Sequence, residues 1–202
     1  MPKGVVNCVN CDINGGGGPI TSDCVKAYVE EYLGTNKPPD GYTTYRLFVD
    51  LVGNQQNLFS IAGTVSSPME FPPAHQEAAP FGANIGGTYP ASWPINLYGA
   101  SSEYDSWLTI GITDGNAANQ GAPFPLMSDD LGFAQWTTTS GLSTTDGAVS
   151  YINHDEGPSG SAIVIAQLTV STGTSWTARC NLQGKTLNGA VWTCEGVEWA
   201  SP

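Results

Sequence analysis

The sequence predicts an all-β protein, an antiparallel β-sandwich of jelly-roll type with a short N-terminal appendage that carries one helix. Among 202 residues there are 25 glycines and 14 prolines, while charged residues make up only 12%, which is typical of many short strands joined by turns. Apolar runs of strand length recur from residue 42 onward, separated by turn residues. The most apolar run, residues 161–170, contains three consecutive β-branched residues and predicts a central strand.

The chain divides at about residue 40 into an N-terminal segment rich in cysteine and glycine (1–40) and a β-sandwich domain (41–202). Within the first part, Val25, Tyr28, Val29 and Tyr32 recur at helical spacing. Ser22 or Asp23 would cap this helix and Gly34 would end it. We therefore expect a helix over residues 22–34, followed by a stiff connector with two prolines at 37–41.

The sandwich domain is expected to begin with two strands, 45–52 and 58–65, that pair as a hairpin. Shorter strands are expected at 107–113, 131–136 and 148–152. In the central strand the even-numbered residues from 162 to 170 would share one face, which leaves Ile163 and Ile165 on the other face in need of a cover. Two last strands, 175–182 and 190–199, would form a hairpin around an Asn-Gly turn.

The five cysteines form an N-terminal group of three and a C-terminal pair. Across the expected C-terminal hairpin, Cys180 and Cys194 predict a disulfide, with two buried thiols as the alternative. Cys8 and Cys24 are the second candidate pair, although the connectivity among Cys8, Cys11 and Cys24 stays open. Disulfides would imply an oxidising compartment, and we expect an extracellular or cell-surface protein.

The charge balance excludes some partners. The formal net charge is −12 with only six Lys and Arg residues, whereas binding to nucleic acid requires a basic surface. The sequence also contains no apolar run of the roughly 18 residues that a membrane-spanning helix needs. We expect neither a nucleic-acid partner nor a membrane span.

The glycine-rich segment 12–23 places Asp12, Asn14, Gly17 and Asp23 at positions one, three, six and twelve of a calcium loop. With the helix expected after it, the segment resembles one half of a dockerin or related EF-hand-like unit. Position five is Gly16, Pro19 interrupts the loop, and no second copy follows. The resemblance implies calcium bound by Asp12, Asn14 and Asp23. The residues themselves favour a degenerate loop ordered by the cysteines, in which case we expect no cofactor.

Residues 45–202 resemble uncharacterised secreted or surface β-sandwich domains of aquatic microbes. The stretches that carry this resemblance are 103–111, 143–149 and 157–160. It implies an extracellular location and brings no catalytic residues.

Candidate chemistry centres on the long irregular region 66–104 and its flanks. A glycosidase needs two carboxylates a few ångströms apart, and Glu70, Glu77, Glu103 and Asp105 are the candidates, with solvated loop acids as the alternative. His75 with Glu77, or residues 154–156, could contribute metal ligands. Aromatic rings on a sandwich can stack on sugars or contact a partner. The candidates for this surface are Phe81, Tyr89, Trp93 and Tyr98, together with Trp107 and Trp136; packing of these rings within the loop or the core is the favoured alternative.

These observations predict a non-enzymatic structural subunit that assembles head to tail with copies of itself into an extracellular filament or surface layer. Residues 1–20 would extend onto the next subunit by strand addition, unless they fold back on their own domain. A carbohydrate-binding or adhesive module, with glycan partners and calcium, is the alternative. A glycoside hydrolase ranks third.

Overall fold

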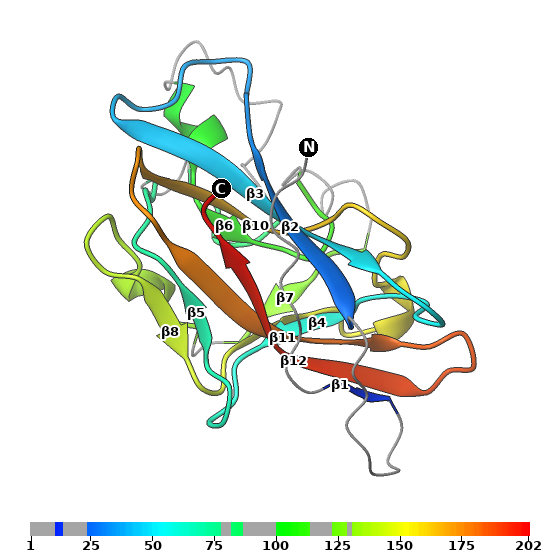
Figure 1. Cartoon of the computed structure of the whole chain (residues 1–202). Coiled ribbons are helices and arrows are strands. Elements are labelled where there is room, and N and C mark those ends of the chain that lie inside the picture. The colour runs from blue at the N-terminus through cyan, green and yellow to red at the C-terminus, as the bar shows by residue number, and fades with distance from the viewer. Residues whose placement is uncertain (1–10, 14–23, 78–81, 87–99, 114–122, 129–130) are drawn as a thin grey trace.

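The computed structural model describes residues 11–13, 24–77, 82–86, 100–113, 123–128 and 131–202. These residues form an all-β sandwich of two antiparallel sheets, which confirms the predicted fold class (Figure 1). The strands are β1 (Cys11–Ile13), β2 (Val25–Glu31), β3 (Tyr42–Leu51), β4 (Ser60–Ala62), β5 (Met69–Phe71), β6 (Trp107–Leu108), β7 (Leu126–Met127), β8 (Leu142–Thr144), β9 (Ala148–Ser150), β10 (Ile163–Ser171), β11 (Thr177–Lys185) and β12 (Val191–Ala200). Three single 3₁₀ turns join them: η1 (Ala100–Tyr104), η3 (Phe133–Gln135) and η4 (His154–Glu156).

The larger sheet has eight strands and the smaller has four. The larger follows the order β1-β12-β11-β4-β9-β7, and β11 also pairs with β5, which in turn pairs with β8. The smaller sheet follows the order β2-β3-β10-β6. The predicted C-terminal hairpin is confirmed as β11 and β12, and Gly189 in its turn has a φ of 83°, a conformation that favours glycine.

The core lies between the facing surfaces of the two sheets. Leu47 and Val49 of β3 are fully buried against residues of the larger sheet such as Leu182 and Trp192. Trp199 of β12 crosses the interface, because its indole nitrogen donates to the carbonyl oxygen of Phe48 at 3.0 Å. Apolar packing and this hydrogen bond together fix the smaller sheet on the larger one.

The helix expected over residues 22–34 is wrong, because residues 25–31 form strand β2. All seven of its residues pair with β3, from Val25 opposite Leu51 to Glu31 opposite Tyr45. Val25 and Ala27 face the core, while Lys26 between them is exposed. Valine and tyrosine also favour strands, so pairing with a long neighbouring strand outweighed the helical spacing.

The hairpin expected between residues 45–52 and 58–65 is also wrong, because the chain changes sheets there. Strand β3 pairs with β2 and β10, whereas β4 pairs with β11 and β9 in the other sheet. The connection is held by Asn57, whose side chain accepts a hydrogen bond from the Lys185 amide and donates to the carbonyl oxygen of His154. These contacts fix the segment after β3 to the larger sheet, so the chain continues there as β4.

The central strand β10 contains a β-bulge that alters its predicted faces. Ile163 lies opposite Val49 and Ala166 lies opposite Leu47, with a register shift between Val164 and Ala166. The extra residue puts Ile163 and Ala166 on the same core-facing side, so the expectation that Val164 shares a face with Ala166 is wrong. Ile163 and Ile165 are both buried in the core, so residues of this chain cover them.

Two shorter strands also differ from expectation. The segment 131–136 contains η3 instead of a strand, and the segment 107–113 is a strand only over Trp107–Leu108. Gly111, with a φ of 80°, turns the chain soon after this strand. Within the residues that the structure describes, no helix is long and apolar enough to cross a membrane.

Candidate functional site

Of the four carboxylates considered for catalysis, Glu77, Glu103 and Asp105 lie beside the β10–β6 end of the smaller sheet, whereas Glu70 belongs to β5 of the larger sheet. Asp105 is almost completely buried, and both of its oxygens accept hydrogen bonds from backbone amides. Its Oδ1 accepts from Glu77 at 2.8 Å and from Ser106 at 2.9 Å, while Oδ2 accepts from Ala83 at 2.7 Å. Burial raises the pKa of Asp105 to about 7, although these three donors favour the carboxylate. The side chain therefore joins three separate backbone segments.

Glu103 has a similar role at a more exposed position. Its carboxylate accepts from the backbone amides of Thr35 at 2.6 Å and Asn36 at 3.0 Å, and from the Asn36 side-chain amide at 2.8 Å. Partial burial acts to raise the pKa of Glu103, but these donors outweigh it and the pKa is lowered. A Cβ atom on Gly34 would lie 2.4 Å from Glu103 Oε1, so this glycine makes room for the carboxylate rather than ending a helix.

A stack of polar and aromatic side chains completes this end of the sheet. The Arg46 guanidinium lies 3.8 Å from the ring centroid of Tyr32 and 5.6 Å from that of Trp107. Its Nε donates to Gln167 Oε1 at 3.0 Å. Gln167 Nε2 donates in turn to the carbonyl oxygens of Glu103 and Asp105, at 3.0 and 2.8 Å. We call Arg46, Glu103, Asp105 and Gln167 the polar cluster.

The geometry of the polar cluster suits structural support better than glycoside hydrolysis. A glycosidase needs a protonated acid and a second carboxylate that both reach the substrate. Here the oxygens of Asp105 and Glu103 already bind groups of this chain. Of the other candidates, Glu70 Oε2 lies 2.9 Å from Arg179 Nε, and Glu77 Oε2 lies 3.8 Å from His75 Nε2.

The calcium prediction lies largely outside the described residues. Asn14 and Asp23 belong to the parts of the chain that the structure does not describe, and Asp12 is described only as a residue of β1 opposite Thr193. Among the described side chains, no three His, Cys, Asp or Glu residues gather as a metal site would require. Calcium binding by this loop stays a prediction.

The cysteines are arranged differently from the expected pattern. Cys180 is a free, buried thiol in this structure, and burial raises its pKa. It lies opposite Val197, while Cys194 lies opposite Leu182, because a register shift separates Cys180 from Leu182. Cys180 and Cys194 are therefore not linked. The predicted pairing of Cys8 with Cys24 involves Cys8, which lies outside the described residues.

The aromatic surface predicted for sugars falls in the undescribed part of the long loop. Phe81, Tyr89, Trp93 and Tyr98 all lie there, so their role stays a prediction. Trp107 and Trp136 are described, and both are buried, so neither is available as a sugar platform. The Trp136 indole nitrogen donates to the Pro72 carbonyl oxygen at 2.7 Å, which shows a structural use of this ring.

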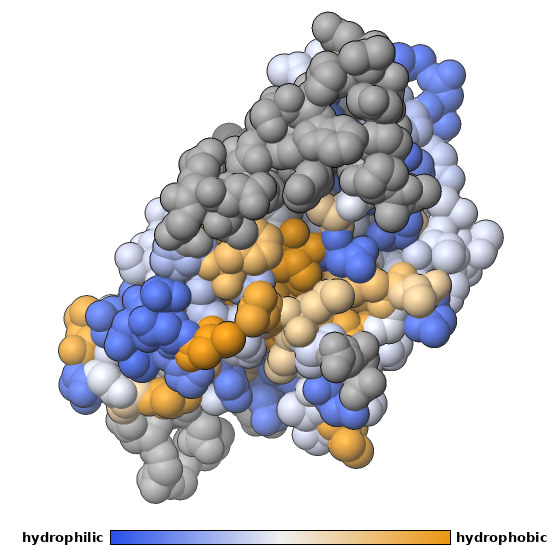
Figure 2. All heavy atoms as spheres, turned by 180° about the vertical axis from the view of Figure 1, so that it is seen from behind, coloured by the Kyte–Doolittle hydropathy of each residue, from blue (hydrophilic) through white to orange (hydrophobic). Residues whose placement is uncertain are grey.

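The ends of the larger sheet expose apolar side chains that we did not expect from the sequence. Leu126 and Met127 of β7 are 53% and 43% exposed, and Ile152, just after β9, is 81% exposed. At the opposite end, Val191 precedes the residues of β12 that pair with β1, and Leu187, in the turn between β11 and β12, is also exposed. Figure 2 shows apolar residues gathered on one face of the molecule. The short apolar run 123–127 inside a polar loop was the available signal.

Comparisons of this chain with protein-family models, with curated proteins and with solved structures find no match. The fold described above defines the protein as an all-β sandwich.

Proposed function

We propose that the protein is a non-enzymatic structural subunit that assembles with copies of itself through the two ends of its larger sheet. The observation that carries this proposal is the location of its exposed apolar residues. The described residues include seven large hydrophobic side chains that are exposed, and five of them lie at these two ends or in the β11–β12 turn. The five are Leu126, Met127, Ile152, Leu187 and Val191.

The β7 end has the properties of a strand acceptor. Leu126 and Met127 pair with Ser150 and Val149 of β9 on one side. Strand β7 ends the pairing order, so among the described residues no strand pairs with its other side. An exposed apolar edge strand favours pairing with another chain, because main-chain hydrogen bonds form while apolar surface is buried.

The two ends differ from each other, which determines the kind of assembly. One end presents β7, and the other presents β1 beside Val191 of β12. A contact between two different surfaces is heterologous, and its repetition gives an open fibre unless the rotation closes a ring. Residues 1–10, directly before β1, carry Val5, Val6 and Val9, and they would be the segment that reaches β7 of the next copy.

An extracellular or cell-surface location is part of this proposal. It is supported by the net charge of −12 with only six Lys and Arg residues. The polar cluster supports the non-enzymatic part, because its carboxylates serve the fold.

The test is the assembly state of the purified chain. The double variant Leu126→Lys/Met127→Lys places two charges on the edge strand and should abolish assembly in sedimentation velocity and electron microscopy. Val65→Lys is the matched control, because Val65 is an exposed apolar residue in the turn after β4, outside β7 and β1, and its substitution should leave assembly unchanged. A wild-type chain that stays monomeric at high concentration, or a double variant that assembles normally, would contradict the proposal.

A second variant tests the proposed donor segment. Removal of residues 1–10 should leave a folded monomer that still accepts a synthetic peptide of residues 1–10. Unchanged fibres would show that the contact uses other residues.

A further inference from the structure

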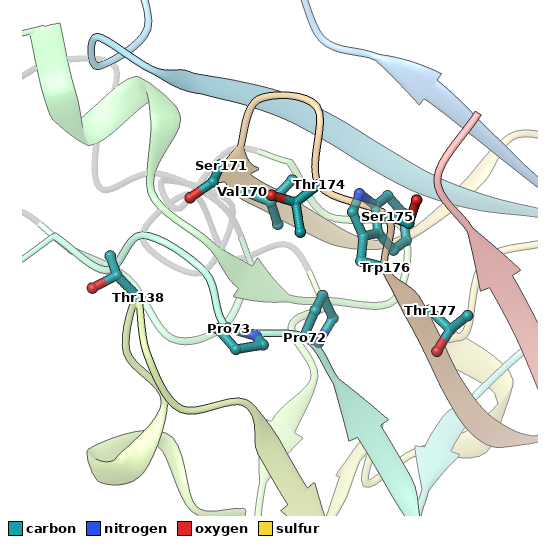
Figure 3. Close-up of a pocket in the computed structure, with 9 residues that line it drawn as sticks. All are labelled: Pro72, Pro73, Thr138, Val170, Ser171, Thr174, Ser175, Trp176 and Thr177. Carbon is teal, nitrogen blue, oxygen red and sulfur yellow. The ribbon is translucent and has the colours of Figure 1, made fainter.

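A pocket of about 430 Å³ opens where the turn between β10 and β11 meets the segment that follows β5 (Figure 3). This volume is within the range of small-molecule sites. The residues that line it are Pro72, Pro73, Thr138, Val170, Ser171, Thr174, Ser175, Trp176 and Thr177.

Backbone hydrogen bonds at the lining residues and next to them hold the walls of the pocket in place. The Ala74 amide donates to the Thr137 carbonyl oxygen at 3.0 Å, which fixes the proline segment against the turn that carries Thr138. The Thr174 amide donates to the Ser171 carbonyl oxygen at 3.2 Å, and the Ser201 amide donates to the Trp176 carbonyl oxygen at 3.0 Å. The pocket is therefore formed before any ligand enters, which lowers the entropic cost of binding.

To the wall of this pocket, Trp176 brings a polar group that has no hydrogen-bond partner among the described residues. The residue is 6% exposed, and its ring packs against Tyr45 with centroids 5.6 Å apart. Its indole Nε1 is buried and finds no hydrogen-bond acceptor in the described part of the chain. Figure 3 shows the indole beside Val170 and Thr174, with Pro72 nearby. The described residues contain five buried polar atoms without a hydrogen-bond partner, and Trp176 Nε1 is the one whose residue lines this pocket, where a ligand could supply the acceptor.

The chemistry of the lining narrows the class of ligand. Five of the lining side chains are hydroxyls, which both donate and accept hydrogen bonds, and the others are Pro72, Pro73, Val170 and Trp176. Among the described residues, no ionisable side chain lines the pocket, so these residues offer a charged ligand no counter-charge. A hydrocarbon would leave the hydroxyls and the indole N–H unpaired. A ligand with an apolar face and many hydroxyls satisfies both parts of the lining.

We propose that this pocket binds a residue of a neutral oligosaccharide. The sugar ring packs against Pro72, Pro73 and the accessible edge of Trp176, and a tilt of the indole on binding brings its covered Nε1 within reach of a sugar oxygen. The hydroxyls of Thr138, Ser171 and Thr174 exchange hydrogen bonds with those of the sugar. This site is separate from the β7 and β1 ends, and it would let a surface subunit hold a glycan without disturbing assembly.

The experiment titrates the full chain with neutral probes, namely maltotriose, cellotriose, laminaritriose, mannotriose and chitotriose, by isothermal calorimetry. At least one should bind, and Trp176→Phe, which keeps an aromatic ring but removes the N–H, should weaken it at least tenfold. Thr138→Val should weaken binding severalfold. Thr139→Val is the matched control, because Thr139 lies in the same turn outside the lining and should bind as wild type.

Three results would overturn the proposal: no probe binds at millimolar concentration, binding is unaffected by both Trp176→Phe and Thr138→Val, or a proline-rich peptide competes more strongly than every sugar. Circular dichroism checks that each variant folds. If Trp176→Phe does not fold, Thr138→Val still tests the proposal. The assembly variant Leu126→Lys/Met127→Lys should bind sugar as wild type, so failure of one proposal leaves the other testable.

Discussion

In most folded proteins polar side chains are exposed and large apolar side chains are buried. Two regions of this molecule depart from that pattern, one by burying polar groups and the other by exposing apolar ones. The polar cluster of Arg46, Glu103, Asp105 and Gln167 buries polar groups beside the smaller sheet. The β7 end of the larger sheet exposes Leu126, Met127 and Ile152 to solvent. Both arrangements cost free energy in an isolated chain unless something compensates them.

The two regions differ in which groups offset this free-energy cost. The Asp105 carboxylate, the Glu103 carboxylate and the Gln167 amide all bind groups of the same chain, so folding alone explains them. At the β7 end, the described residues provide no strand that covers the edge. Changes in the polar cluster should therefore alter stability, and changes at the β7 end should alter association.

The largest loss of folding stability is expected for Asp105→Ala. This substitution leaves the buried amide of Ser106 and the partly buried amides of Glu77 and Ala83 without their acceptor. The free energy of unfolding, measured by urea titration, should fall by about 3 kcal/mol, because unsatisfied buried donors cost about 1–3 kcal/mol each and the site relaxes in part. Asp155→Ala, on an exposed 3₁₀ turn, should change it by less than about 0.5 kcal/mol. A loss below about 1 kcal/mol for Asp105→Ala would mean that the cluster is not a stability element.

The pH dependence of stability should reveal the same carboxyl group. The pKa of Asp105 is raised to about 7 in the folded chain, so the folded state retains a proton that the unfolded state loses near its ordinary pKa of 3.8. Stability from this group is greatest at low pH and falls as the pH rises toward 7, by about 2 kcal/mol between pH 5 and pH 7. Asp105→Asn cannot titrate, and its unfolding free energy should lose this slope. Equal slopes in the two proteins would contradict the assignment.

The sequence predicted the two-sheet class but not the pairing that creates these regions. Alternation of apolar residues and the Asn-Gly turn identified the β11–β12 hairpin, since both are local signals. The helix expected at residues 22–34 failed because Val25, Tyr28 and Val29 fit a strand equally well, and the partner strand β3 decided between them. The bulge at Ile165 left no signal in the sequence, because it depends on the register with β3.

The candidate site was predictable only in part, for the same physical reason. Glu103 and Asp105 were singled out as carboxylates, yet their role depends on amides from residues 35, 36, 77 and 83, which only the fold brings near. Trp107 and Trp136 were considered as sugar platforms because a sequence does not show which rings are buried. Trp176 was missed as a site residue, since its unpartnered nitrogen becomes visible only with the pocket around it.

A smaller effect is expected for Glu103→Ala, which tests the more exposed side of the polar cluster. The loop at Thr35 and Asn36 would lose its acceptor, and solvent would replace it in part because Glu103 is only half-buried. We expect the free energy of unfolding to fall by about 1.5 kcal/mol, with faster amide exchange confined to residues 32–37. The pKa of Glu103 is lowered in the folded chain, so this loss should be present above pH 4.5 and shrink as the pH falls below it. Exchange that speeds up uniformly would indicate a global effect instead.

The smallest effect on stability is expected for Leu126→Lys at the β7 end, and this sharpens the comparison most. Leu126 is 53% exposed, so a lysine can extend into solvent with little loss of packing, and the unfolding free energy of the dilute monomer should change by less than about 0.5 kcal/mol. The same variant should still lose association in sedimentation velocity, because a charge on an edge strand opposes pairing with a second chain. A loss of stability above about 2 kcal/mol would show that Leu126 packs against its own chain, and the β7 end would then belong with the polar cluster as part of the fold.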